Sequence, residues 1–368
     1  MLEDGLPEDD VIRRLASVRE KDRGYRKVLS SMCTIPHPIA VKAHNIFIES
    51  NLGDPGLFMG TASIEAELIE RLGSLMHLSR PCGYATSGGT ESNIQALRIA
   101  RENAKKGHPN IIIPESAHFS FEKACEILSI EMRQVPSAEG YVMDADKVEE
   151  RIDGNTIGMV GVAGTTEYGV VDPIAHLSDI AVDRDLFLHV DAAFGGLVLP
   201  FVPGSPDFDF RLEGVSSLSV DPHKMGMSTI PCGCIIVRNP DYFRSTEVDT
   251  PYLTVKKECT LCGTRPGAPV ASALAVLDHL GKKGLAEIVG RCMDNTSALI
   301  GGMEELGYPV AVQPAVNVAS FCCDGTPDGW IVSRTRHGHM RTVCMPHVTA
   351  ETIKEFLQDI GRMQCSTN

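Results

Sequence analysis

A lysine stands where a buried strand is expected to end. Residues 219–226 read SVDPHKMG, and Lys224 closely follows the apolar run Val215–Val220. An ammonium group removed from water must find a partner or lose its proton, so a lysine at this point is costly. Either the aliphatic part of the side chain extends to solvent and the ammonium group is exposed, or the amine is a reactive group of a binding site. The position of the lysine alone does not distinguish these two interpretations.

An aspartate has comparable surroundings earlier in the chain. The stretch Leu186–Gly196 reads LFLHVDAAFGG, and Asp191 stands at the end of its apolar part. This carboxylate is a solvated loop residue, a metal ligand together with His189, or the partner of a cationic ligand atom. The small side chains of Ala192 and Ala193 favour a flat ligand that lies against the end of the strand.

Two other segments carry groups that bind ligands. The turn TSGGTE at residues 86–91 opens a predicted helix, and a glycine-rich helix start offers free N–H groups to an anion. It lacks the spacings of a P-loop or a dinucleotide fold, so by itself it is equally an ordinary helix cap. His118, in ESAHFSF, follows the strand-like run NIIIP, and a lone histidine is most often structural.

The four segments make sense together. An amine, a carboxylate, an imidazole and an anion-binding helix start are the groups that pyridoxal phosphate requires. The amine condenses with the aldehyde, and the carboxylate keeps the pyridine nitrogen protonated, so that the ring can accept electrons. Each group also lies at the end of a predicted strand, where parallel sheets bind their ligands.

The ordered motifs TSGGTES, AHFSF, HVDAAFGG and SVDPHKMG resemble those of the group II pyridoxal-phosphate decarboxylases of fold type I. Over nearly the whole chain, the sequence is similar to the archaeal tyrosine/aspartate decarboxylases of that group, including NLGDPGLFMGT, AGTTEYGVVD, DTPYLT and RTVCMPHV. The resemblance implies that tyrosine is converted to tyramine for methanofuran biosynthesis, or aspartate to β-alanine for coenzyme A biosynthesis.

The resemblance also implies roles for individual residues. Lys224 would bind the cofactor covalently, Asp191 would pair with the pyridine nitrogen, and Tyr252 on a mobile loop would reprotonate the α-carbon. The other expected cofactor contacts are His118 and Ala193 on opposite ring faces, Thr165 or Thr166 near the phenolic oxygen, and Gly88, Gly89, Thr90 and His223 by the phosphate. Asp221 is expected to hold local backbone, because the pyridine partner is Asp191.

Short apolar runs alternate with helical patterns from the predicted helix at 63–78 to about residue 240. This α/β order predicts a mostly parallel sheet with helices on both faces, and the resemblance to fold type I implies that the sheet is of the seven-stranded type. The predicted strands are 110–114, 131–135, 157–163, 186–190, 215–220 and 233–237, and the predicted helices are 90–106, 119–128, 145–151 and 173–184. We expect an N-terminal helical and loop segment at 1–60, with one amphipathic helix at 7–22, a large cofactor-binding domain at 61–266, and a small α+β domain at 267–368.

Composition limits the partners. The formal charge of −14 disfavours nucleic acid and anionic membranes, and the acidic N-terminus lacks a secretory signal. We therefore expect a cytoplasmic enzyme that acts on a small amino acid. The fold type implies a homodimer with shared active sites, in which the loop Gly263–Gly267 crosses to the partner.

Two alternatives remain at this stage. The aldehyde lyases of the sphingosine-phosphate type share the glycine-rich, aspartate and lysine segments, but this chain carries AGTTEYG and the Tyr252 loop. Two cysteine pairs, Cys232 with Cys234 and Cys259 with Cys262, suggest a zinc-binding protein instead. The first pair lies inside the strand-like run CGCIIV, which favours small core residues, so no metal is expected.

Overall fold

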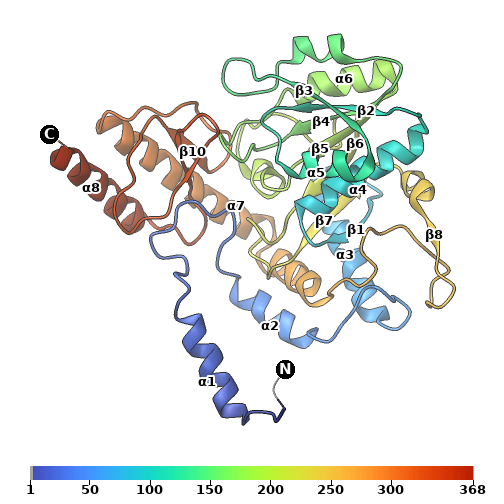
Figure 1. Ribbon diagram of the computed structural model, residues 1–368, viewed down its shortest axis with the longest axis horizontal. Helices are drawn as coiled ribbons and strands as arrows, with labels where there is room; N and C mark the ends of the chain where they lie inside the picture. The colour runs from blue at the N-terminus through green and yellow to red at the C-terminus, as the bar shows by residue number, and fades with distance from the viewer. Residues whose placement is uncertain (1–2, 368) are drawn as a thin grey trace.

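A seven-stranded sheet forms the centre of the larger part of the molecule in the computed structural model, which describes residues 3–367 (Figure 1). The strand order is β1-β7-β6-β5-β4-β2-β3, and only β7 runs antiparallel to its neighbours. The strands are β1 (Cys82–Thr86), β2 (Asn110–Pro114), β3 (Glu131–Val135), β4 (Thr156–Val162), β5 (Phe187–Asp191), β6 (Val215–Val220) and β7 (Gly233–Val237). The predicted mostly parallel sheet is confirmed, and β1 is the strand that the sequence analysis missed.

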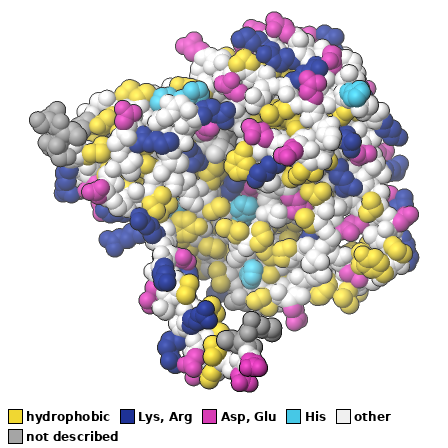
Figure 2. Space-filling view, in the orientation of Figure 1, with side chains coloured by type: hydrophobic (Ala, Val, Ile, Leu, Met, Phe, Trp, Pro, Cys, Tyr) yellow, Lys and Arg dark blue, Asp and Glu magenta, His cyan; other side chains and the backbone are white. Residues whose placement is uncertain are grey.

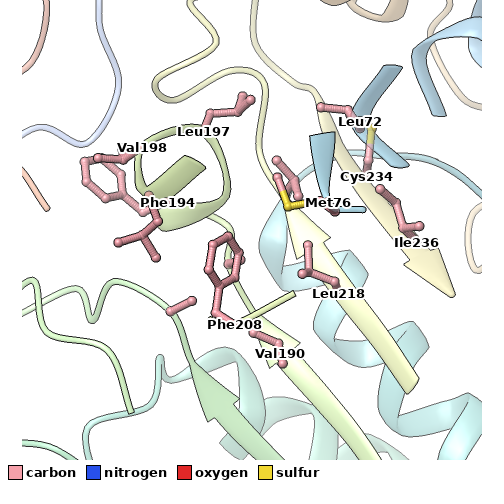
Figure 3. Packing of buried hydrophobic residues seen from close by; sticks show 14 of the residues in the cluster. Leu72, Met76, Val190, Phe194, Leu197, Val198, Phe208, Leu218, Cys234 and Ile236 are labelled. Atoms are coloured by element: carbon pink, nitrogen blue, oxygen red, sulfur yellow. The ribbon is translucent and has the colours of Figure 1, made fainter. Parts of the chain in front are cut away.

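Helices cover both faces of this sheet. Successive side chains of a strand point to opposite faces, and both sets are apolar here, so each face needs a layer of helices to bury it. On β2, Ile112 packs into one core, whereas Ile111 and Ile113 pack into the other. The helices that supply these cores are α3 (Met59–Leu75), α4 (Gly89–Ala104), α5 (Ser120–Leu128) and α6 (Ile174–Arg184). Figure 3 shows the first core, in which Leu218 and Ile236 from the sheet pack with apolar residues that include Phe208.

The predicted helix at 145–151 is wrong. Its residues form two single turns of 3₁₀ helix, Ala145–Lys147 and Glu149–Arg151, since seven residues are too few for a stable α-helix without strong packing. Other short 3₁₀ turns are Gly195–Leu197, Leu199–Phe201 and Pro240–Thr246. A two-stranded hairpin, β8 (Val248–Asp249) with β9 (Lys257–Glu258), follows the large sheet.

The C-terminal part is a small α+β unit. Helix α7 (Ala268–Glu305) bends at Gly281, whose φ of 59° is non-helical, so it covers the two helical patterns of the sequence at 268–280 and 285–306. Beyond it, β10 (Val318–Phe321), β12 (Met340–Val343) and β11 (Ser333–Arg334) form an antiparallel sheet next to α8 (Ala350–Thr367). The domain limits 60/61 and 266/267 stay predictions, and residues 1, 2 and 368 of those segments lie outside the described residues.

Two helices precede α3 in the chain. Helix α2 (Pro38–Ile46), which the sequence analysis took for loop, packs on α7. Helix α1 (Glu8–Arg19) is where an amphipathic helix was predicted, but it buries none of its residues and projects from the body (Figure 1). Across residues 3–367, no helix combines the length and apolar character needed to cross a membrane.

Candidate active site

The four predicted segments meet at one cavity of about 360 Å³. It lies at the carboxyl ends of β4, β5 and β6, which is where open parallel sheets bind ligands. Its lining combines the predicted residues with several that were not predicted, namely Ser87, Gly88, Gly89, Thr90, Asn93, Ser116, His118, Val162, Gly164, Thr166, Asp191, Ala193, Phe194, Asp221, His223 and Lys224.

Asp191 is fixed as an acceptor by three donors. Its Oδ1 accepts from the Ala193 N–H at 3.1 Å and the Ser219 hydroxyl at 3.1 Å, and its Oδ2 accepts from Asn93 Nδ2 at 2.9 Å. Burial alone would raise the pKa of this carboxyl, but the Lys224 charge and the hydrogen bonds outweigh burial and lower it. The residue is therefore a buried anion that can pair with a cationic ligand atom.

Lys224 forms an ion pair rather than reaching solvent. Its Nζ lies 3.1 Å from Oδ2 of Asp221, and its side chain is only 20% exposed. Burial alone would lower the pKa of the ammonium group, but the carboxylates of Asp221 and Asp191 outweigh burial and raise it. The expectation that Asp221 merely holds local backbone is wrong for its side chain, whose buried Oδ1 has no hydrogen-bond partner.

The glycine-rich turn makes a close approach to these residues. A Cβ on Gly89 would lie 3.0 Å from the Cβ of Ala193 and 3.2 Å from Oδ2 of Asp221. A Cβ on Gly88, at φ 149°, would lie 3.0 Å from Cε1 of His223. Because α4 begins at Gly89, its first N–H groups have no partner within the helix and can bind an anion.

His118 and Thr166 complete the wall of the cavity. Burial lowers the pKa of His118, and its Nδ1 accepts from the Ser120 N–H at 3.2 Å, so the imidazole is a flat neutral ring at neutral pH. Thr166 lines the cavity, whereas Thr165 is buried and its hydroxyl accepts from the Val170 N–H at 3.2 Å. Of the two threonines, Thr166 is placed to contact a ligand.

Tyr252, like Thr165, is a predicted site residue that does not line the cavity. It lies between β8 and β9 and is 86% exposed. The loop Gly263–Gly267, which was predicted to cross to a partner, is held inside its own chain at Arg265, whose guanidinium pairs with Glu65 and donates to the Ala85 carbonyl at 2.9 Å. Any crossing to a partner must therefore involve other residues of this loop.

Sequence reasoning missed three buried polar residues at or beside the cavity, namely Asn93, Ser219 and Arg341, and it gave Asp221 a different role. Asn93 could have been found from the sequence, as a polar residue on the buried face of a predicted helix. Arg341 could not, because it is 117 residues from Lys224 in the sequence. Its Nε donates to the Thr166 carbonyl and its Nη1 to the Ser30 carbonyl at 2.9 Å, so it joins the small unit to the cavity wall.

The cysteine pairs carry no metal-site geometry. Cys232 and Cys234 are buried at β7, and burial raises the pKa of both thiols. Among the described residues, no three His, Cys, Asp or Glu side chains gather as metal ligands would. His189, the other suggested metal ligand, is hydrogen-bonded at both ring nitrogens to Ser217 and Asn93.

The residues around the cavity fit pyridoxal phosphate. The lysine amine and the buried anion are of the types that the aldehyde and the pyridinium require, and the close glycine turn offers N–H groups to the phosphate. The volume also lies within the range of small-molecule sites. Sheet and cavity together have the organisation of a fold type I pyridoxal-phosphate enzyme.

Comparison with known proteins agrees with this class. A family model described as "Pyridoxal-dependent decarboxylase conserved domain" matches residues 60–307, and the chain belongs to this family. A Methanoculleus marisnigri protein named "Probable L-tyrosine/L-aspartate decarboxylase" is 60% identical over 98% of this chain and 99% of its own. A "Probable L-aspartate decarboxylase" of Archaeoglobus fulgidus is 51% identical over 96% and 99%.

Solved structures share the fold. The sphingosine-1-phosphate lyase of Burkholderia pseudomallei has a TM-score of 0.91 and 27% identity, and the match covers 98% of this chain and 91% of the lyase. The glutamate decarboxylase of Lactobacillus brevis has a TM-score of 0.89 and 23% identity, with 98% and 93% covered. At this identity the second match shows the fold alone.

Proposed function

We propose that the protein removes the α-carboxylate of L-tyrosine or L-aspartate as carbon dioxide, with pyridoxal phosphate bound at Lys224. The observation that carries the proposal is the convergence of Lys224 and Asp191 on one cavity at the strand ends. Membership of the decarboxylase family supports the reaction, and the names of the 60% and 51% identical relatives support the two substrates.

The cofactor, when bound, supplies a ring that accepts the electron pair left by the departing carbon dioxide. Asp191 would hold the proton on the ring nitrogen, and His118 and Ala193 would contact the ring. Gly88, Gly89, Thr90 and His223 would bind the phosphate, and Thr166, in preference to Thr165, would lie near the phenolic oxygen. The resemblance to the decarboxylase family assigns these roles, and the positions of the side chains around the cavity support them.

Lys224 needs a free electron pair before it can bind an aldehyde carbon. Asp221 stabilises the protonated form of this amine, because its Oδ2 lies 3.1 Å from Nζ and its charge raises the pKa of the ammonium group. The imidazole of His223 also lies beside this carboxylate, with its Nε2 3.7 Å from the same Oδ2. Asp221 therefore controls the charge on Lys224.

Tyr252 delivers a proton to the α-carbon after carbon dioxide leaves, and its site lies in a second subunit. Its 86% exposure supports this role, since the hydroxyl is free to enter a neighbouring cavity. Exposed apolar side chains support a homodimer. Figure 2 shows hydrophobic side chains gathered beside α1. In and after α2, the apolar side chains that are at least 45% exposed include Val41, Ile46, Ile48, Leu57 and Met59.

Mixing two inactive variants tests the shared site. Lys224→Ala and Tyr252→Phe are unfolded and refolded together, so that about half of random dimers are mixed and each of these has one intact site. We expect about one quarter of wild-type activity from the mixture. Activity no higher than that of the Tyr252→Phe variant, in a mixture shown to contain mixed dimers, would contradict sharing.

The reaction itself is tested by carbon dioxide release. The holoenzyme is incubated with each common L-amino acid labelled at C1, and the amine product is identified by mass spectrometry. We expect tyramine from tyrosine or β-alanine from aspartate, with no release by Lys224→Ala. Release from neither substrate would contradict the proposal.

The 0.91 TM-score to a sphingosine-phosphate lyase favours one second candidate, an aldehyde lyase on the same lysine. Both reactions need the same cofactor contacts, so the cavity alone does not separate them. Formation of a long-chain aldehyde from a phosphorylated amino alcohol, without carbon dioxide, would replace the decarboxylase proposal. The cytoplasmic location predicted from the N-terminal sequence stays a prediction.

A further inference from the structure

A chain of buried polar side chains lies behind Asp191. Asn93 Nδ2 is 2.9 Å from Oδ2 of Asp191, Asn93 Oδ1 is 3.0 Å from Nε2 of His189, and His189 Nδ1 is 2.8 Å from the Ser217 hydroxyl. Ser217 and His189 are fully buried, and Asn93 is 1% exposed. The three residues come from β6, β5 and α4, so the chain exists only when the sheet and α4 are assembled.

The direction of every hydrogen bond in this row of side chains follows from the charge of Asp191, the residue at its end. An ionised carboxylate only accepts, so Asn93 must turn its NH₂ group toward Asp191 and its carbonyl toward His189. His189 must then donate from Nε2. A neutral imidazole carries a single N–H, which is at Nε2 here, so Nδ1 accepts a hydrogen bond from the Ser217 hydroxyl.

The surroundings keep His189 in this neutral form. Burial lowers the pKa of the imidazole to about 4, although the nearby Asp191 charge acts in the opposite direction. The second hydrogen of the Asn93 amide is also used, because Nδ2 lies 3.0 Å from the Ser120 hydroxyl. Both ends of the Asn93 amide are thus engaged, and neither can turn over without leaving buried groups unpaired.

Asn93 further connects two parts of the cavity. It belongs to the first turns of α4, which begins at the glycine turn, and it also lines the cavity itself. A cofactor held by its phosphate at this helix start would therefore meet a carboxylate positioned by the same helix. The position of Asp191 relative to the phosphate is set through Asn93.

We propose that Ser217, His189 and Asn93 act as a one-way chain of donors that keeps Asp191 ionised and aimed at the ring nitrogen of the cofactor. The inference rests on the proposed role of Asp191. None of the three is required to react, so His189 and Ser217 are positioning residues. Their effect is expected in how tightly the apoprotein holds pyridoxal phosphate, because a misplaced carboxylate stabilises the pyridinium less.

Isosteric variants test the chain. Asn93→Asp replaces the donor by a carboxyl group beside Asp191. His189→Leu removes the donor from Nε2, and His189→Gln restores an N–H at that position. The matched control is Asn110→Asp, because Asn110 is equally buried and donates to Asp153 at 2.8 Å, but lies at the start of β2 outside the cavity lining.

The measurements are the Kd for pyridoxal phosphate, by fluorescence titration of each apoprotein, and the apoprotein Tm. Supporting residues behind a functional ligand typically contribute 10-fold to 100-fold in affinity, so we expect losses of about that size for Asn93→Asp and about tenfold for His189→Leu. His189→Gln should lie within about threefold of wild type. Asn110→Asp should lower the Tm and leave the Kd unchanged.

Three results would overturn the inference. A wild-type Kd in Asn93→Asp, with a Tm loss equal to that of Asn110→Asp, would mean that Asn93 only stabilises the fold. A Kd for His189→Gln as weak as that for His189→Leu would contradict the donor direction. Failure of the wild-type apoprotein to bind pyridoxal phosphate would reject the role of Asp191 and the chain with it, an outcome distinct from the first two.

Discussion

Lys224 and Tyr252 are assigned to one reaction but have opposite surroundings. The lysine amine lies in a polar cavity against Asp221, with its side chain 20% exposed, whereas the tyrosine is 86% exposed on the loop between β8 and β9. The difference divides the site into two halves. One chain builds the half that lines the cavity, and in the proposed mechanism the half that moves protons is completed by the Tyr252 loop of a second subunit.

Backbone pairing explains why the first half is complete. Asp191 pairs in register with Ser219 of the neighbouring strand, and Ser219 donates to its carboxylate. The loop that carries Tyr252 is bounded by the two-residue pairing of β8 with β9. It is held by a turn in which the Thr250 N–H donates to the Lys256 carbonyl at 2.9 Å, and by hydrogen bonds of Thr254 with Asp54 and Gly56. A strand end is fixed by the sheet, and this loop is not.

Substitution of Lys224 is expected to give the largest effect. Lys224→Ala removes the only side chain that can bind the cofactor covalently at this position, so turnover should fall at least about 10⁴-fold. The release of labelled carbon dioxide measures the loss. Near-wild-type turnover in this variant would show that the buried half of the site is dispensable, and would contradict the role of Lys224.

Arg265 anchors the loop Gly263–Gly267, which follows β9, to the buried half. Arg265→Met would leave Glu65, whose side chain is 14% exposed, without its cation, and should cost about 3–5 kcal/mol in the free energy of unfolding. Urea denaturation measures this change. The control Arg244→Met breaks an exposed pair with Asp241 and should cost less than about 1 kcal/mol. Equal losses would show that the anchor is unimportant.

Tyr252→Phe separates the two halves functionally. Loss of a proton donor typically lowers a rate 10²-fold or more, so we expect about a hundredfold slower release of amine. The Kd for pyridoxal phosphate should stay unchanged, because the tyrosine does not line the cavity. A weaker Kd together with unchanged turnover would reverse the assignment.

The smallest effect is expected from α1. Its apolar residues Val11, Ile12, Leu15 and Val18 are 37–59% exposed, so Leu15→Gln should change the unfolding free energy of the separated chain by less than about 0.5 kcal/mol. If α1 contacts a second copy, dimer dissociation should become about tenfold easier, since burying a leucine contributes about 1.5–3 kcal/mol. Sedimentation at several concentrations measures this, with Arg13→Gln as the control. No change in dimer affinity would remove α1 from the interface.

The sheet could be predicted largely because its strands are short apolar runs bounded by turn residues. Four of its seven strands, β2, β3, β6 and β7, have the predicted limits. Strand β1 was missed because CGYAT has few apolar residues, and α2 because its prolines and neighbouring glycines resemble a loop. The start of α2 at Pro38 is helical since proline is tolerated in the first turn.

The predicted site residues on strand ends and the glycine turn meet in space, because parallel strands bring distant segments to one edge. The sequence could not predict which of these side chains contact one another. The contact of Asp221 with Lys224 depends on the turn after β6, and the position of Arg341 beside Thr166 depends on how the small unit packs. Such contacts arise only from tertiary structure.

The attachment point of the cofactor tests the central claim most directly. Holoenzyme is treated with borohydride, digested, and analysed by mass spectrometry for the peptide that carries the reduced pyridoxyl group. The cavity geometry predicts modification of Lys224 and no visible absorbance in Lys224→Ala. Modification at another lysine, or full labelling of Lys224→Ala, would contradict the account.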